Sequence, residues 1–187
     1  MKQVKRRLFF AFELPGRAVQ TIESLQHDLQ RKLRGPLIKW TSPDSWHITT
    51  HFVGEVDDVV ANNLADAMSL IPTDAVSFSP WALDIYPSKE RPRYIVLKLA
   101  DPSASGFKMH QAHFPILLQE NVAVDTQPWS PHIALGKIQT GRNGFSPNLS
   151  EFHIPQETFT VPKLTLFETK RNHDVRYHPI ECRNLPR

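Results

Sequence analysis

The sequence predicts an α+β fold of two lobes, each built on a mostly antiparallel sheet, around a central cleft with the helices outside. First, several short segments alternate apolar and polar side chains with a period of two, which is typical of half-buried strands. Second, strand segments often follow one another without an intervening helix, which favours antiparallel pairing. Third, a helix followed by a strand that starts with histidine occurs twice, at His47 and at His132. This repetition suggests a pseudo-two-fold relation between the lobes, within one domain that spans residues 1–187.

The spacing of apolar residues defines the expected elements. Between residues 17 and 33 they recur every three or four positions, as in an amphipathic helix, and Gly35 and Pro36 end it. Pro115 is expected to kink or split the third helix, because proline removes a helical hydrogen bond. Residues 140–155 are rich in Gly, Asn, Ser and Pro and are expected to form a loop. The expected helices are residues 17–33, 56–70 and 101–120, and the expected strands are residues 7–12, 37–40, 45–54, 76–86, 93–99, 131–137, 159–170 and 176–183.

Composition narrows the class of protein. The chain has 187 residues, of which 40% are hydrophobic and 22% charged, an ordinary globular composition. No apolar run approaches the ~20 residues that cross a membrane. The basic N-terminus is followed by an apolar run broken at Glu13 and Pro15, so we expect no signal peptide. The single cysteine, Cys182, excludes an internal disulfide and fits a reducing compartment, which predicts a cytoplasmic protein. The net charge of +3 suits an anionic ligand such as nucleic acid but does not by itself identify one.

The first histidine strand, residues 45–54, carries a row of polar side chains. Successive side chains of a strand point to opposite faces, so two rows are expected. The buried row would hold Ile48, Thr50 and Phe52. The other row would hold His47, Thr49 and His51. A row of imidazole, hydroxyl and imidazole serves no structural purpose in a strand, which indicates a functional surface.

Two histidines can divide acid–base work, because the unperturbed imidazole pKa is near neutrality. One imidazole would deprotonate a nucleophile and the other would protonate a leaving oxygen. A hydroxyl two residues after a histidine lies on the same face of the strand and can donate to charge on a phosphoryl centre. No metal is required if hydroxyls and a cation hold the oxygens. A single His-x-Thr strand is common by chance, whereas two such strands, each entered through a proline-containing turn, are more specific.

These motifs resemble those of a known family. Residues 47–50 (HITT) and 132–135 (HIAL) resemble the two His-x-Thr/Ser-x signatures of the 2H phosphoesterase superfamily. Residues 7–15 (RLFFAFELP), 51–56 (HFVGEV) and 176–180 (RYHPI) resemble its bacterial branch. That branch comprises the RNA 2′,3′-cyclic phosphodiesterases, also called 2′-5′ RNA ligases. The resemblance extends over nearly the whole chain.

The resemblance implies a bilobal fold and metal-independent opening of a 2′,3′-cyclic phosphate to a 2′-phosphate, with reverse 2′-5′ ligation in some members. It implies as partner an RNA with a 2′,3′-cyclic phosphate end or a small cyclic nucleotide. We expect no cofactor and no membrane partner, and a monomer is the default expectation. By position, His47 and His132 would be the acid and the base, and Thr49 would hold the phosphate. The usual family assignment has His132 activate water and His47 protonate the leaving 3′ oxygen. The sequence itself does not order the two roles.

Two positions depart from the family pattern. Ala134 stands where the second motif carries Thr or Ser, so one hydroxyl donor is missing, and loss of such a donor commonly lowers a rate by about 10²–10³-fold. Lys137 stands where bacterial relatives often have Arg, which keeps a cation but loses the bidentate fork. On a regular strand Lys137 would face away from His132, and it reaches the cleft only if the chain bends at Gly136.

Other aromatic and histidine residues have two interpretations each. His51 would contact substrate or be a solvated strand residue. Phe10 or Phe12 would stack a base, as aromatics do in single-strand binders, or pack in the core. Trp46 and Trp129 would line the cleft or pack, and the role of Tyr177, which matches a family position, stays open. His110 and His113 lie three residues apart on an expected helix. They would form half of a zinc site or be surface and helix-face histidines.

Two alternatives to the cyclic phosphodiesterase are retained. One is a non-catalytic RNA- or nucleotide-binding module that has lost turnover through Ala134. The other is a 2H enzyme for a different substrate, such as 2′-5′ oligoadenylate or ADP-ribose 1″,2″-cyclic phosphate. The loops at residues 87–92 and 140–155 would decide between substrates.

Overall fold

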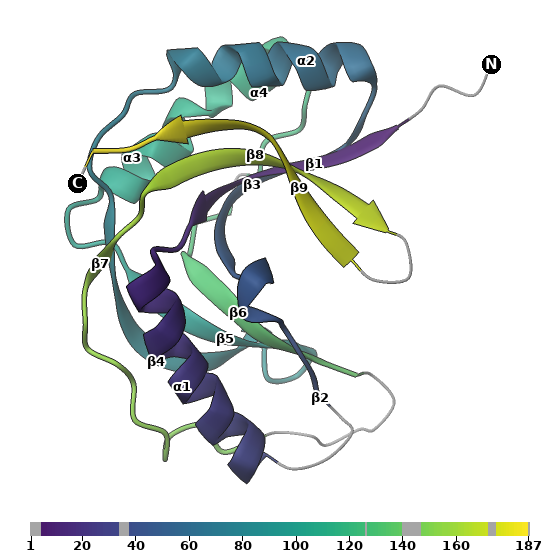
Figure 1. The fold of residues 1–187 in the computed structure, drawn as a ribbon. Helices are drawn as coiled ribbons and strands as arrows, with labels where there is room; N and C mark the ends of the chain where they lie inside the picture. Colours follow the sequence, from purple (N-terminus) through teal and green to yellow (C-terminus); the bar gives the residue numbers. More distant parts are fainter. Residues whose placement is uncertain (1–4, 34–37, 126, 140–146, 172–174, 187) are drawn as a thin grey trace.

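The computed structural model describes residues 5–33, 38–125, 127–139, 147–171 and 175–186. Its strands form two antiparallel sheets, which confirms the predicted α+β class (Figure 1). The β1 sheet has the strand order β3-β1-β8-β9, and the β6 sheet has the order β2-β6-β5-β4-β7. The elements are β1 (Arg6–Glu13), α1 (Gly16–Lys32), β2 (Ile38–Trp40), β3 (His47–Val56), α2 (Asp58–Ala67), β4 (Ser77–Pro87), β5 (Pro92–Ala100), α3 (Ser105–Ala112), α4 (Phe114–Gln119), β6 (His132–Ile138), β7 (Phe159–Thr160), β8 (Lys163–Arg171) and β9 (Val175–Asn184).

Most predicted elements are present, and one differs. The expected break in the helix at residues 101–120 is confirmed, because it is split into α3 and α4, with Pro115 in the first turn of α4, where its ring is tolerated. The predicted strand at residues 159–170 is two strands in different sheets, because β7 pairs with β4 whereas β8 pairs with β1. Pro162 lies between them and has no N–H to continue a ladder. Of the predicted loop at residues 140–155, residues 140–146 lie outside the described part of the chain, and the remainder contains no helix or strand.

The helices cover one face of each sheet, and His47 and His132 lie on the opposite faces. In Figure 1, α2, α3 and α4 lie over the β1 sheet, and α1 lies against the β6 sheet. Gln26 on α1 donates to the backbone oxygen of Leu135 on β6 at 2.8 Å. Phe10 and Ile133 belong to the buried core on the helix-covered faces. Paired strands place directly opposite residues on the same face, so His47, opposite Glu13, lies on the face of β1 that alternates away from Phe10. No helix in the described part of the chain is long and apolar enough to cross a membrane.

A register shift in the middle of β3 changes the faces of His51 and Phe52. Thr49 lies opposite Ala11 and His51 lies opposite Phe10, so Thr50 is an extra residue, as in a β-bulge. The bulge reverses the alternation, and His51 is buried whereas Phe52 is 71% exposed. The predicted faces of these two residues are therefore wrong.

A second register shift, in β6, brings Lys137 to the face of His132. His132 lies opposite Lys98 and Ala134 opposite Val96, but Lys137 lies opposite Tyr94, with Leu135 as the extra residue. Lys98, Val96 and Tyr94 alternate regularly on β5 and share one face. The bend that Lys137 required is therefore present, one residue before Gly136.

Close packing of β2 against β6 requires a glycine at residue 136. A Cβ there would lie 2.7 Å from Cγ2 of Ile38 and 3.0 Å from Cε3 of Trp40. We expect Gly136→Ala to lower the free energy of unfolding by about 1–3 kcal/mol, because the added methyl overpacks the site. Urea denaturation measures this loss. Gly16→Ala is the control, because a Cβ there meets no atom within 4 Å. Equal stability of both variants would contradict the prediction.

Candidate active site

The backbone holds the two motif histidines in the same way. Each begins its strand, and each ring places Nδ1 2.8 Å from the carbonyl oxygen two residues earlier, that of Ser45 for His47 and that of Ser130 for His132. A carbonyl oxygen only accepts, so Nδ1 carries the hydrogen in both rings. This tautomer leaves Nε2 of each ring for proton exchange with a substrate.

Side chains of the two sheets approach each other at these histidines. The charge of His132 on the β6 sheet contributes to lowering the pKa of His47 on the β1 sheet. The pKa of Tyr177 on β9 is raised by burial and, to a smaller extent, by Tyr94 on β5. The indole N–H of Trp129, just before β6, donates to the backbone oxygen of Thr49 on β3 at 3.0 Å. The histidine-bearing faces of the two sheets therefore face each other.

Burial favours the neutral form of both histidines. Desolvation lowers the pKa of His47 to about 4, opposed by the hydrogen bond to Ser45 and assisted by the charge of His132. Desolvation also lowers the pKa of His132, opposed by the hydrogen bond to Ser130 and assisted by the charge of Lys98. A bound anion would raise both pKa values, because an opposite charge stabilises imidazolium.

Aromatic rings form the desolvating surroundings of both histidines. The ring centroid of Phe9 lies 4.9 Å from that of His47, and the Tyr177 ring meets His47 edge-on at 5.0 Å. The Tyr86 ring stacks on His132 at 4.9 Å. Sequence reasoning missed Phe9 and Tyr86. Phe9 lies in an apolar run in which only the flanking Arg7 and Glu13, at even spacing from it, indicate its face. Tyr86 reaches His132 from β4, a strand that does not pair with β6.

The structure brings five of the seven predicted site residues to the facing surfaces. On β3, Thr49 is opposite Ala11 and therefore shares the face of His47. On β6, Ala134 and Lys137 share the face of His132. Thr49 and Ala134 occupy corresponding places, each two residues after its histidine on the same face.

The other two predicted site residues lie in the core, which corrects their predicted contact with substrate. Phe10 is fully buried on the helix-covered face of β1, with its ring 4.7 Å from that of His113. His51 lies opposite Phe10 and is 3% exposed, because the bulge turns it inward. Phe12 is buried on the same face as Phe10.

The histidine pair expected to be either half of a zinc site or surface and helix-face histidines is also internal. His110 and His113 are buried rather than exposed, and they pack around His51. Nδ1 of His110 donates to the backbone oxygen of Thr50, and Nδ1 of His113 donates to that of Met109. Among the residues that the structure describes, no group of three His, Cys, Asp or Glu side chains is arranged to hold a metal ion.

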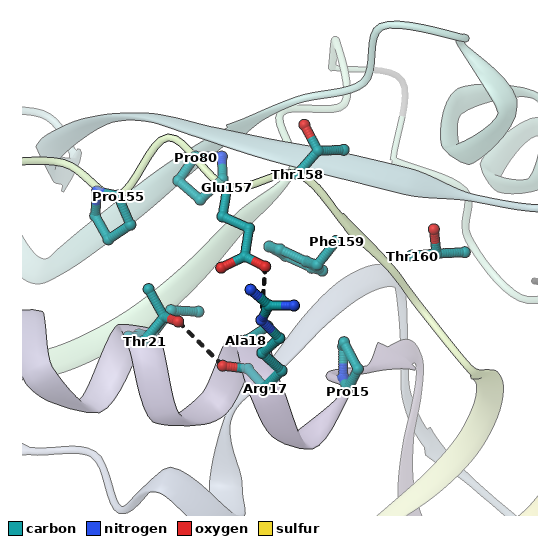
Figure 2. A pocket seen from close by; sticks show the side chains of 11 residues that line it. Pro15, Arg17, Ala18, Thr21, Pro80, Pro155, Glu157, Thr158, Phe159 and Thr160 are labelled. Atoms are coloured by element: carbon teal, nitrogen blue, oxygen red, sulfur yellow. Dashed lines mark hydrogen bonds and ion pairs between the residues drawn. The ribbon is translucent and has the colours of Figure 1, made fainter.

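A separate cavity of about 270 Å³ lies where the start of α1 meets β4 and β7 (Figure 2). Arg17 and Glu157 form an ion pair of 2.8 Å at this cavity. None of the predicted site residues lines it. The cavity is therefore not part of the histidine site.

Comparisons with known proteins show similarity to one family of phosphoesterases. The family model "LigT like Phosphoesterase" matches residues 12–96. An RNA 2′,3′-cyclic phosphodiesterase of Geobacillus stearothermophilus is 24% identical over 92% of this chain and 55% of its own length, so the chain spans about half of that relative. One of Bacillus subtilis is 24% identical over 76% of this chain and 78% of its own length.

Solved structures share the fold. E. coli LigT complexed with 3′-AMP superposes with a TM-score of 0.79 at 19% identity, over 98% of this chain and 100% of that one. TT0787 of Thermus thermophilus superposes with a TM-score of 0.80 at 17% identity, over 96% of this chain and 97% of that one. The family match, the curated relatives and the shared fold thus all make the chain similar to LigT-like phosphoesterases.

Proposed function

We propose that the protein hydrolyses 2′,3′-cyclic phosphate ends of RNA to 2′-phosphates, with His47 and His132 as the acid–base pair. The observation that carries the proposal is the matched orientation of the two rings. Each donates from Nδ1 to a backbone carbonyl and keeps Nε2 for the reaction, one from each of two facing sheets. The curated relatives named RNA 2′,3′-cyclic phosphodiesterase support the choice of substrate.

The reaction needs one neutral and one protonated imidazole. The neutral ring takes a proton from water as the water oxygen bonds to phosphorus. The protonated ring gives its proton to O3′ as the bond between phosphorus and O3′ breaks, which leaves a 2′-phosphate and a 3′-hydroxyl. A 5′-hydroxyl in place of water forms a 2′-5′ link by the same steps. Both substitutions are displacements at phosphorus that acid–base catalysis accelerates by about 10²–10⁴-fold.

Neighbouring side chains would hold the phosphoryl oxygens. The hydroxyl of Thr49 shares the face of His47 and can donate to charge that develops on an oxygen. The ammonium of Lys137 shares the face of His132 and supplies positive charge there. These groups allow the reaction to proceed without a metal ion.

The usual family assignment places the proton on His47 and leaves His132 as base. In the free protein the pKa of His47 is about 4, so this assignment requires the bound phosphate to raise the pKa of His47 strongly. Which histidine carries the proton is therefore determined in the substrate complex rather than in the free protein.

The pH dependence of kcat/KM follows from these shifts. The free protein must hold one proton on the pair, and both histidine pKa values lie below 6.5, with that of His47 at about 4. Because both histidine pKa values are lowered, the free protein loses this proton at a pH below 6.5. We therefore expect kcat/KM to fall about tenfold per pH unit above pH 6.5. A plateau of kcat/KM between about pH 7 and 9 would contradict this.

Lys98→Gln should move the fall of kcat/KM to higher pH, because the charge of Lys98 lowers the pKa of His132.

The direct test is hydrolysis of an RNA oligonucleotide with a 2′,3′-cyclic phosphate end in EDTA. We expect EDTA-resistant conversion to a 2′-phosphate, distinguished from a 3′-phosphate by ³¹P NMR. Binding of the oligonucleotide without turnover would instead favour the RNA-binding module. Turnover restricted to another 2′-linked or cyclic nucleotide would favour a different 2H substrate.

A further inference from the structure

Three rings form a continuous stack between α3, the segment before β6, and β3. The ring of Trp129 lies parallel to that of His110, with centroids 5.1 Å apart and planes 9° apart. The other face of His110 stacks on His51 at 4.1 Å and 11°. His51 and His110 are buried, and the ring of Phe114 closes edge-on against both. The stack thus joins the strand of the first motif to the segment that leads into the second.

Two rings of this stack also bind the backbone of β3 at its bulge. The indole N–H of Trp129 donates to the oxygen of Thr49, and Nδ1 of His110 donates to the oxygen of Thr50, each at 3.0 Å. Because a carbonyl cannot donate, Nδ1 of His110 carries the hydrogen. Two successive carbonyls of one strand are therefore held by side chains from two other segments.

These two bonds lie where β3 has few hydrogen-bond partners in neighbouring strands. β3 is the edge strand of the β1 sheet, and Thr50 has no residue opposite it in β1. Carbonyls at such a position lack a ladder partner unless another group donates to them. A one-residue change of register would turn every following side chain to the opposite face. The placement of Thr49 toward the site, and of His51 away from it, depends on the bulge staying at Thr50.

We propose that Trp129 and His110 are positioning residues that hold the bulge of β3, and through it His47 and Thr49, in the reactive arrangement. The expected effect on kcat rests on the proposed function. The expected effect on the position of the β3 bulge does not depend on any reaction. Trp129 belongs to the same segment as Ser130, whose carbonyl holds Nδ1 of His132. The segment therefore sets the position of both histidines relative to each other.

The test removes each donor while keeping a ring. Trp129→Phe and His110→Phe lose the bonds to Thr49 and Thr50, and His110→Asn returns an amide donor without the ring. Trp46→Phe is the control for the indole, because the Trp46 N–H is buried without an acceptor among the described residues. His113→Phe is the control for the imidazole, because its Nδ1 donates within its own helix region, to Met109.

We expect kcat on the cyclic phosphate oligonucleotide to fall about tenfold or more in Trp129→Phe and His110→Phe, since small misplacements of catalytic groups are costly. KM should change less than about twofold, and His110→Asn should recover a large part of kcat. Both controls should keep kcat near the wild-type value, even where their melting temperatures fall. Unchanged kcat in the two donor variants, or equal losses in the controls, would overturn the proposal.

A second readout separates this inference from the proposed reaction. In NMR spectra, the amide signals of Thr49 and Thr50 should move in the donor variants and not in the controls. The pKa of His47 should rise from about 4 toward 6.5 as the loosened strand exposes the ring. If the wild-type protein does not hydrolyse the oligonucleotide, the proposed function fails. The NMR signals then decide the inference, which unchanged signals would overturn.

Discussion

Replacing His47 or His132 by alanine is expected to lower kcat on the 2′,3′-cyclic phosphate oligonucleotide by about 10²–10⁴-fold. Each variant removes one Nε2 from a pair in which both rings are held from Nδ1 by a backbone carbonyl. Because the two rings act as a unit, the double variant should lose little more than either single one. Rates in EDTA measure the effect, and His27→Ala, an exposed position on α1, is the control.

A substrate with sulfur in place of O3′ assigns the two roles. Thiolate leaves without protonation, so the variant that lacks the acid should recover activity on this substrate, whereas the variant that lacks the base should not. Recovery in His47→Ala would support the family assignment. Recovery in His132→Ala would reverse it, in agreement with the low pKa of His47 in the free protein. Full activity of both variants on the oxygen substrate would contradict the two-histidine mechanism.

Introducing a hydroxyl at Ala134 is the change from which we expect a large gain. Ala134 is two residues after His132 on the same face, as Thr49 is after His47. A threonine there would add a donor to charge that develops on the phosphoryl oxygens, so Ala134→Thr should raise kcat by as much as about 10²-fold. Its branched side chain suits a strand, so the fold should tolerate it.

The matched control for this gain is Ala134→Val. Valine has the shape of threonine without the hydroxyl, so a gain shared by both variants would reflect packing and not a donor. The complementary change, Thr49→Val, should lower kcat, because it removes the hydroxyl on the opposite sheet. Equal rates for wild type and Ala134→Thr would show that the missing hydroxyl does not limit turnover.

Local patterns were sufficient for most of the fold. The alternation of polar and apolar residues placed His47 and Thr49 on one strand face, and helical spacing located α1. Proline positions indicated the division between α3 and α4. These features depend on neighbours within a few residues, where side-chain periodicity and backbone restriction act directly.

The two bulges were decided only by tertiary structure. An extra residue at Thr50 turns His51 into the core and Phe52 outward, and an extra residue at Leu135 turns Lys137 toward the site. Nothing in the local alternation shows where a register will slip, because the slip depends on the partner strand.

The sequence by itself therefore determined the α+β class, the two histidine strands and the family that they resemble. The tertiary structure decided which residues surround each histidine. Phe9 and Tyr86 contact the two rings, and His110 and Trp129 hold the first strand from segments 60 and 80 residues away along the chain. Contacts over such separations form when the sheets close on each other, and the desolvation that they cause lowers the pKa of histidines that the sequence only names.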